Sequence, residues 1–212
     1  MASGTRTIGI LLFDDVEELD AVGPWEVLAA WTTYFPDDGW AVTTLSRGGG
    51  PIRCAKGLAL VAHHSMADCP PLAVLVHPGG QGTRPQTKDE AHLDWVRAQV
   101  KDEAHLDWVR QQAATAELMT SVCTGSLVYA AAGLLRDRPA TTHWGSLDHL
   151  ARLDPSIEVR PDERWVDDGD VITSAGVSAG IDMALHLVGR LASPDRSAEV
   201  RHIIQYDPAP PH

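Results

Sequence analysis

The sequence predicts an α/β fold in which helices cover both faces of a mostly parallel sheet. Three short, continuous apolar runs, at 7–13, 72–77 and 118–122, are typical of strands that are buried on both faces. Helical segments separate these runs along the chain, and this alternation favours parallel strands. A chain of 212 residues can bury one good core. We therefore expect a single domain over 1–212.

The other elements follow from apolar spacing and turn residues. An acidic turn is expected at 14–20, and Pro24 suits the first position of a helix that runs through Trp31. A strand at 41–46 and a projecting hairpin at 52–62 come next. The elements expected after the 118–122 strand are, in order, a helix through Leu135, a short strand closed by 141–144, a hairpin over 164–173 that turns at Asp168-Gly169, and a helix over 176–191.

One helical segment, expected over 88–116, contains a tandem duplication at 88–113. The sequence KDEAHLDWVR occurs at 88–97 and again at 101–110, an offset of 13 residues. That offset turns a helix by about 220° beyond three full turns, so both copies cannot face one core along a straight helix. We expect the second copy, which leads into the 118–122 strand, to pack as the native helix. Two short copies make no solenoid, so the repeat is interpreted as a recent or an artificial duplication.

Composition excludes several classes of function. The formal net charge is −12 and no two Lys or Arg residues are adjacent, which argues against binding to DNA or RNA. No stretch is apolar enough to cross a membrane, and the first residues lack the features of a signal peptide. Three cysteines, Cys54, Cys69 and Cys123, are too few and too unevenly spaced for a disulfide framework or a zinc site. By default, we expect free thiols and a cytoplasmic location.

Cys123 is the strongest candidate for a catalytic residue. It follows the buried run 118–122 directly, and Thr124, Gly125 and Ser126 then open a helix. This strand-to-helix turn is the arrangement of a nucleophile elbow, although the usual motif has serine between two glycines. The turn exposes the side chain at the edge of the sheet, and a helix N-terminus favours the thiolate. The alternative is a buried structural cysteine, the interpretation we give to Cys54 and Cys69.

Two further features are expected at the same edge of the sheet, where strands end and ligands bind. Gly79 and Gly80 follow the 72–77 strand, and their N–H groups could stabilise negative charge near Cys123. Asp20 precedes Gly23-Pro24 at the first strand-to-helix junction and could exchange a proton with the thiol. The alternatives are an ordinary glycine turn and an acid that interacts with the helix dipole.

His143, in the sequence TTHW, is a second candidate for the proton carrier. A histidine at a strand end is more often a packed structural residue, and that alternative stays open beside the catalytic one. The glycine-containing segments at 48–51 and 79–82 do not match a phosphate-binding pattern.

Together these motifs resemble the ThiJ/PfpI superfamily, and within it the isocyanide hydratases, which are also called isonitrile hydratases. The similarity runs from Ile8 to about Pro211, apart from one copy of the repeat. The matching stretches are LLFDDVEELDAVGPWEVL, ADCPPL, PGGQG, TSVCTGSLVYAAAGLL, ATTHW, GVSAGID and YDPAPP. The same subgroup supplies sensor domains of AraC-type transcription regulators.

The resemblance implies a flavodoxin-like, glutamine-amidotransferase-like fold. It also implies that Cys123 is the nucleophile, that Asp20 is the acid facing it, and that Thr124 is the threonine found beside the nucleophile in the hydratases. The related peptidases have histidine after the cysteine, so its absence argues against proteolysis. Val177 is expected in a helix that flanks the nucleophile. A homodimer is implied, and neither a metal nor an organic cofactor is.

The resemblance further implies a hydration of a small isocyanide to an N-substituted formamide through a cysteine thioimidate. Asp20 would deliver the proton, and the backbone at Gly80 and Thr124 would orient water or the developing charge. Two alternatives from other classes remain. One is a ligand-sensing module related to the AraC-type sensors, and the other is a redox-responsive or glyoxal-handling protein, because an exposed thiolate oxidises readily.

Overall fold

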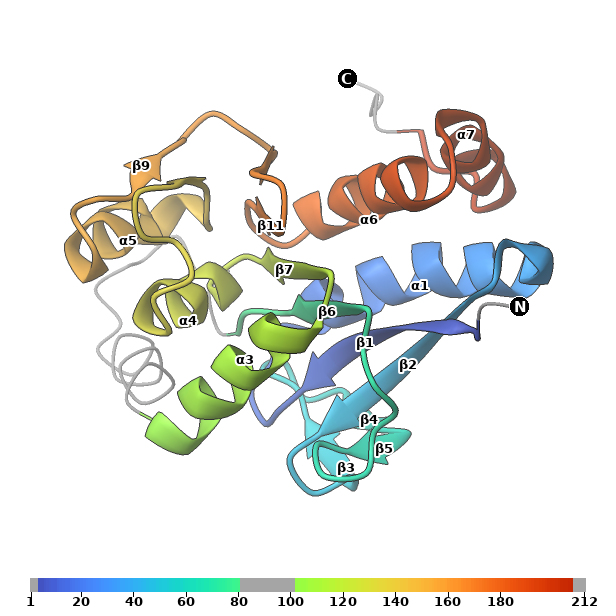
Figure 1. Ribbon diagram of the computed structural model, residues 1–212, viewed down its shortest axis with the longest axis horizontal. Helices are drawn as coiled ribbons and strands as arrows, with labels where there is room; N and C mark the ends of the chain where they lie inside the picture. The colour runs from blue at the N-terminus through green and yellow to red at the C-terminus, as the bar shows by residue number, and fades with distance from the viewer. Residues whose placement is uncertain (1–3, 81–101, 208–212) are drawn as a thin grey trace.

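The computed structural model describes residues 4–80 and 102–207, and a seven-stranded sheet lies at its centre (Figure 1). The strand order is β10-β11-β7-β6-β1-β2-β5. Every neighbouring pair is parallel except β10 and β11. The bounds are β1 (Arg6–Leu12), β2 (Trp40–Ser46), β5 (His64–Ser65), β6 (Val74–His77), β7 (Leu118–Val122), β10 (Trp165–Asp167) and β11 (Val171–Ser174). The predicted mostly parallel sheet is confirmed.

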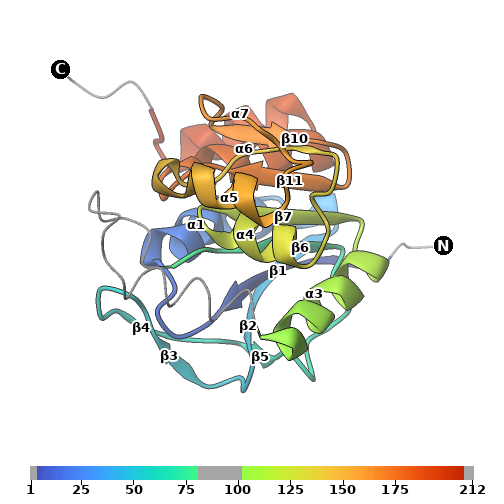
Figure 2. The ribbon, with the colours of Figure 1, turned by 90° about the vertical axis from the view of Figure 1, so that its left-hand side faces the viewer.

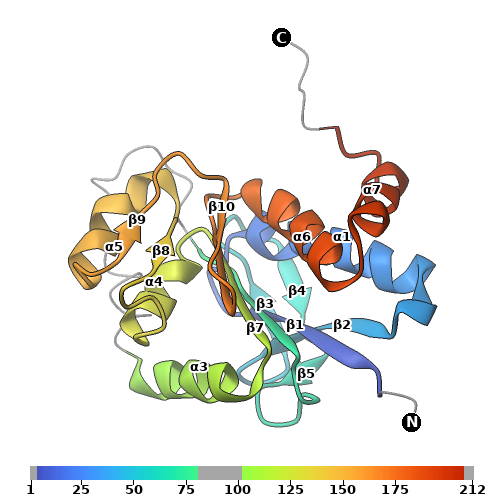
Figure 3. The same cartoon turned by 45° about the horizontal axis from the view of Figure 1, so that its top comes forward.

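Helices cover both faces of this sheet, as predicted (Figures 1 and 3). One face is covered by α1 (Glu18–Tyr34), α6 (Ala179–Leu191) and α7 (Pro194–Ile203). The other is covered by α3 (Glu103–Thr115), α4 (Gly125–Ala131) and α5 (Leu147–Leu153). Figure 2 shows α6 and α7 beside each other above α1. The central strands supply apolar side chains to both layers, since Ile10 belongs to the first core cluster and Leu11 to the second.

Short elements complete the described part of the chain. The predicted hairpin at 52–62 is confirmed as β3 (Pro51–Arg53) paired antiparallel with β4 (Ala59–Val61). The predicted late hairpin is confirmed as β10 and β11, which turn around Gly169 in the left-handed conformation. A small separate sheet pairs β8 (Pro139–Ala140) with β9 (Glu158–Val159), a strand that we had not expected. Two 3-10 turns are η1 (Pro36–Asp38) and η2 (Trp144–Ser146).

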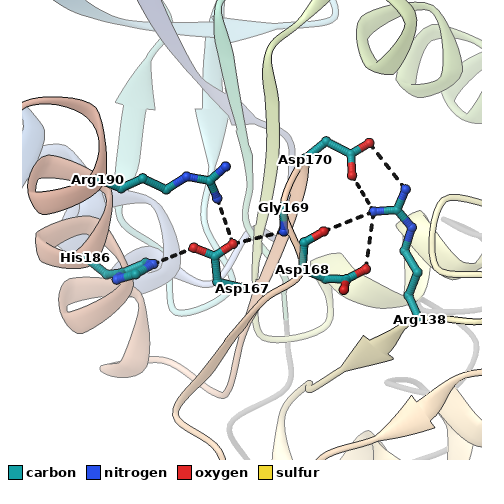
Figure 4. Close-up of polar contacts among 7 residues, drawn as sticks. All are labelled: Arg138, Asp167, Asp168, Gly169, Asp170, His186 and Arg190. Atoms are coloured by element: carbon teal, nitrogen blue, oxygen red, sulfur yellow. Dashed lines mark hydrogen bonds and ion pairs between the residues drawn. The ribbon is translucent and has the colours of Figure 1, made fainter.

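Ion pairs hold the turn of the late hairpin from both sides (Figure 4). The Asp167 carboxyl lies 2.7 Å from Nε2 of His186 and 2.7 Å from Nη1 of Arg190, both on α6. On the other side Arg138, just before β8, pairs with Asp168 and Asp170. Because Val171 is paired with Met119 and Ser174 with Val122, this cluster lies at the end of the sheet opposite Cys123.

Some predicted element boundaries were wrong. Helix α1 begins at Glu18, not at Pro24, so the last three residues of the expected acidic turn, 18–20, are helical and Pro24 lies inside the helix. Proline has no N–H, and the helix continues past it with the carbonyl of Asp20 lacking its usual i+4 donor. Helix α4 ends at Ala131 and does not reach Leu135, because turns follow and Gly133 adopts φ 83°.

Two further expectations were wrong near the later site residues. The strand expected to close at 141–144 is only Pro139–Ala140, and His143 lies between it and η2. Val177 precedes α6 and adopts φ 50°, so it is not in the helix that the resemblance placed it in. A positive φ is rare for a β-branched residue such as valine, so the sequence pattern did not indicate that the backbone turns at Val177 before the helix begins.

The second copy of the repeat packs as predicted. Asp102 caps α3 by accepting a hydrogen bond from the N–H of His105, and Leu106 and Val109 are buried in the second core cluster. The first copy, at 88–97, lies outside the described residues. None of the helices in the described ranges is long and apolar enough to cross a membrane.

Candidate active site

Cys123 lies at a sharp turn between β7 and α4, and its own backbone is strained. Its φ is 56°, in the left-handed region that L side chains rarely adopt. The turn is pinned from two sides. The N–H of Cys123 lies 3.1 Å from the carbonyls of Ser174 and Ala175, and the Thr142 hydroxyl donates to the Cys123 carbonyl at 2.9 Å. The strain is therefore held in place by β11 and by the segment after β8.

The loop after β6 places two N–H groups on neighbouring site residues. The N–H of Gly79 donates to Oδ2 of Asp20 at 3.0 Å, and the N–H of Gly80 donates to the Thr124 hydroxyl at 3.1 Å. A Cβ at Gly79 would come within 3.0 Å of the Thr124 backbone, which explains the glycine. Both N–H groups bind side chains of the site, and their expected role in stabilising charge that develops near Cys123 stays a prediction.

Asp20 is fully buried in the first turns of α1. Its Oδ1 makes no hydrogen bond of ordinary geometry with the residues that the structure describes, and the neighbouring reactive group is the Cys123 thiol. Burial, and then the negative charge of Glu17, raise the pKa of Asp20 well above its usual value; the Gly79 N–H and the Cys123 thiol act against this. The carboxyl is consequently poised to hold a proton.

The Cys123 sulfur is also fully buried. Burial, and then the Asp20 charge, raise the pKa of the Cys123 thiol well above its usual value. The N–H groups of Thr124 and Val177 face the sulfur and lower this pKa, but they do not overcome the loss of solvation. The expectation of an exposed thiolate was therefore wrong for this conformation, because burial outweighs the helix N-terminus.

Sequence reasoning missed the charged residues behind Asp20. Glu17 is buried, its N–H donates to the Gly79 carbonyl at 2.9 Å, and its carboxylate pairs with Lys56 of the β3–β4 hairpin. Glu18 accepts a hydrogen bond from the Lys56 N–H at 2.6 Å. The sequence EELD was interpreted as a turn, and no local signal indicates that a lysine 39 residues later closes over it.

His143 is buried and lies close to the site by sequence, since it follows Thr142. Its Nδ1 accepts a hydrogen bond from the N–H of Gly145 at 3.1 Å, and its ring packs on Gly176, where a Cβ would collide with it. Gly176 is followed by Val177, whose N–H faces the sulfur. These contacts fit the structural interpretation of His143, which shapes the turn that carries Val177.

The chain matches the model of the DJ-1/PfpI family over residues 6–190. The chain belongs to this family. It is 41% identical to isonitrile hydratase from Pseudomonas putida over 96% of its own length and 80% of the relative's. It is 25% identical to the transcriptional regulator GbdR from Pseudomonas aeruginosa, over 95% of this chain but 51% of the regulator. A ThiJ/PfpI family crystal structure from Pseudomonas syringae superposes with a TM-score of 0.81 at 31% identity, covering 99% of this chain and 78% of that one.

In this DJ-1/PfpI domain, the chemistry within reach is an addition by sulfur coupled to a proton transfer. A thiol and a carboxyl lie together out of water, and two backbone N–H groups face the sulfur. In the described ranges no group of three or more His, Cys, Asp or Glu side chains could hold a metal ion.

Proposed function

We propose that this protein hydrates isocyanides to N-substituted formamides, with Cys123 as the nucleophile and Asp20 as the proton carrier. The observation that carries the proposal is the buried Cys123–Asp20 pair at a strained elbow. The 41% identity to an isonitrile hydratase over 96% of the chain supports the same reaction class.

The pair suits this substrate because an isocyanide carbon accepts a nucleophile and a proton on the same atom. In the proposed reaction, Asp20 takes up the proton as the Cys123 sulfur attacks the terminal carbon of R–N≡C. Asp20 then returns the proton to that carbon, and the product is the thioimidate Cys–S–CH=N–R. The raised pKa values of both groups keep this proton within the pair until substrate arrives.

Water completes the proposed cycle. With Asp20 now acting as base, water adds to the thioimidate carbon while the nitrogen gains a proton. The sulfur then leaves and recovers its proton, which releases R–NH–CHO. The hydroxyl of Thr124, held by the Gly80 N–H, is placed to orient that water. The N–H groups of Thr124 and Val177 stabilise the sulfur anion as it leaves.

The test is a direct assay of the purified protein with a simple alkyl isocyanide, in which NMR follows the appearance of the formamide. Cys123→Ala should remove turnover while the folded spectrum and the melting temperature are retained. The matched control is Cys54→Ala, because Cys54 is also buried and its pKa is also raised, to about 11, but it lies in the turn of the β3–β4 hairpin and not at a strand-to-helix elbow. A Cys123→Ala protein with a tenth of the wild-type rate would end the proposal.

A sensor role is the second candidate, because the chain aligns over 95% of its length with half of the regulator GbdR. A sensor would bind a small ligand without turnover, so the same assay separates the two functions. A redox or glyoxal role is less well supported, since the Cys123 sulfur is fully buried and its pKa is raised, which slows oxidation.

We also propose that the protein forms a homodimer. Near the site, the hairpin exposes two large apolar side chains, with Val61 69% and Leu58 47% accessible. Val61 borders a hollow of about 150 Å³ that Trp25 and Leu60 also line. Contact with a second copy would bury these side chains. Light scattering measures the mass, and Val61→Asp should shift a dimer to the monomer.

A further inference from the structure

A pair of buried histidines lies directly behind the Gly79-Gly80 loop. His77 is the last residue of β6 and is 1% exposed, while His105 on α3 is 6% exposed. Their Nε2 atoms are 2.9 Å apart. The other ring nitrogen of His77, Nδ1, lies 2.8 Å from the carbonyl oxygen of Pro78. The mechanism proposed above uses neither histidine.

These contacts determine where the protons are. A carbonyl oxygen only accepts hydrogen bonds, so Nδ1 of His77 carries a hydrogen and donates it to Pro78. Burial, and then His105, lower the pKa of His77 to about 3, so its ring is neutral at pH 7. A neutral ring has one N–H, so Nε2 of His77 is an acceptor and Nε2 of His105 is the donor. The N–H of His105 thus stabilises the tautomer of His77 that donates to Pro78.

The Pro78 carbonyl connects this pair to the reacting groups. It lies against Gly125 in the first turn of α4, where a Cβ would collide with the carbonyl of His77 and approach that of Pro78. The next N–H along the chain, from Gly79, is the one that binds Asp20, and the following one binds Thr124. A change in the tautomer of His77 would turn a bare nitrogen toward the Pro78 oxygen and repel it.

The alternative is that both rings only fill space. His77 makes an edge contact with Tyr129, with ring centroids 5.8 Å apart, and His105 stacks on Trp108 at 6.3 Å. Packing needs a side chain of this size, but it does not depend on which ring nitrogen carries the hydrogen. The positioning role needs a donor at Nδ1 of His77 and a donor at Nε2 of His105, and amide side chains can supply either.

We propose that His105 and His77 are positioning residues for the reaction at Cys123. His105 fixes the tautomer of His77, and His77 holds the Pro78 carbonyl and with it the Gly79-Gly80 loop. The helix that contains the second repeat copy thereby sets the geometry of the site. This inference rests on the proposed function, and its test includes a measurement that does not.

The test compares variants that keep or remove each donor. His105→Gln keeps an N–H near the position of Nε2, and His105→Leu removes it. His77→Asn keeps an N–H near the position of Nδ1, and His77→Leu removes it. The control is His202→Gln, because His202 is an exposed residue of α7. Each protein is assayed for kcat and KM with an alkyl isocyanide and for its melting temperature.

We expect His105→Leu to lower kcat by about 10- to 100-fold with a smaller change in KM, because the reacting groups lose their alignment. His105→Gln should recover most of that loss, and the kcat of His77→Asn should exceed that of His77→Leu. Equal losses in the Leu and Gln variants of His105, or wild-type kcat in His105→Leu, would overturn the proposal. If His77→Leu does not fold, the two variants of His105, which is the more peripheral histidine, still decide the question.

A second measurement is independent of isocyanide turnover. Mass spectrometry follows the rate at which iodoacetamide alkylates Cys123. The Gly79 N–H lowers the pKa of Asp20, and the Asp20 charge raises that of Cys123, so displacement of the loop changes the alkylation rate. We expect a changed rate in His105→Leu and a restored rate in His105→Gln. If the wild type does not hydrate isocyanides, this result alone supports or rejects the positioning role.

Discussion

At the scale of single residues, the site depends on a buried thiol and a buried carboxyl, and burial is the main reason that both pKa values are raised. Asp20→Asn removes the proton carrier, so kcat should fall by about 10²- to 10⁴-fold. The variant also removes the charge that raises the pKa of Cys123, so alkylation of the thiol should begin at a lower pH than in the wild type. Stopped assays give kcat, and the pH profile of alkylation gives the shift; an unchanged rate would remove Asp20 from the mechanism.

The glycine that opens α4 gives a second prediction. Gly125→Ala gains about 1 kcal/mol of helix propensity. The added Cβ, however, would meet the backbone carbonyl of His77 within 3.0 Å, and overpacking against backbone costs about 1–3 kcal/mol. We expect a net loss of stability and of activity, measured by denaturant unfolding and by turnover.

Gly48→Ala is the matched control for this comparison. Gly48 is exposed and has no atom within 4 Å of a Cβ placed there. A Gly125→Ala protein as stable and active as Gly48→Ala would show that the loop can move aside without cost.

Sequence reasoning identified site residues only where a reactive residue type occurs in a recognisable local pattern. Cys123, Asp20 and Thr124 could be proposed because an elbow and a nearby acid are local patterns, and the structure brings them together. Glu17, Lys56, His77 and His105 could not be predicted, because their importance depends on contacts between segments distant in the chain. The ionisation of Cys123 was predicted wrongly, since burial is a property of the folded molecule.

At the scale of the elements, α3 shows which copy of the repeat the fold uses. Leu106 is 2% exposed in the core between α3 and the sheet, so Leu106→Ala should cost about 2–5 kcal/mol of unfolding free energy. Leu93 is the equivalent residue of the first copy. Because Leu106 already fills that core position, Leu93→Ala should cost less. Urea denaturation of both variants measures the difference, and equal costs would contradict this assignment.

The strands were predictable because a buried parallel strand is apolar at every position, and the 118–122 run and β7 coincide. Helix starts were less predictable. Pro24 favoured a start at position 24, but Gly23 and Gly180 allow close packing of α1 on α6, and that packing supports six further residues before the proline. Tertiary contacts therefore decided the boundary.

At the scale of the whole molecule, His77 links stability to pH. Its pKa is about 3 in the folded protein and 6.5 in the unfolded chain. Between pH 3 and pH 6.5, His77 therefore takes up a proton only when the chain unfolds. The contribution of His77 is complete above pH 6.5 and falls by about 1.4 kcal/mol per pH unit below it. Asp20, whose pKa is raised, acts in the opposite direction, because the native state retains its proton as pH rises.

A comparison with His77→Asn isolates the first effect, since asparagine does not titrate and Asp20 is common to both proteins. The stability of the wild type relative to the variant should decrease by about 2 kcal/mol between pH 6.5 and pH 5. Urea denaturation at both pH values measures this difference. A constant difference would mean that His77 is protonated in the folded protein.

The left-handed residues have a consequence for engineering thermostability. Asp137 and Gln205 are exposed and adopt φ 56° and 51°, so glycine there would relieve backbone strain of about 1 kcal/mol each. The same exchange at Val177 would relieve a similar strain but loosen the N–H that faces the sulfur. A stability screen across the chain should therefore accept the two peripheral changes and meet a trade-off with catalysis at the third.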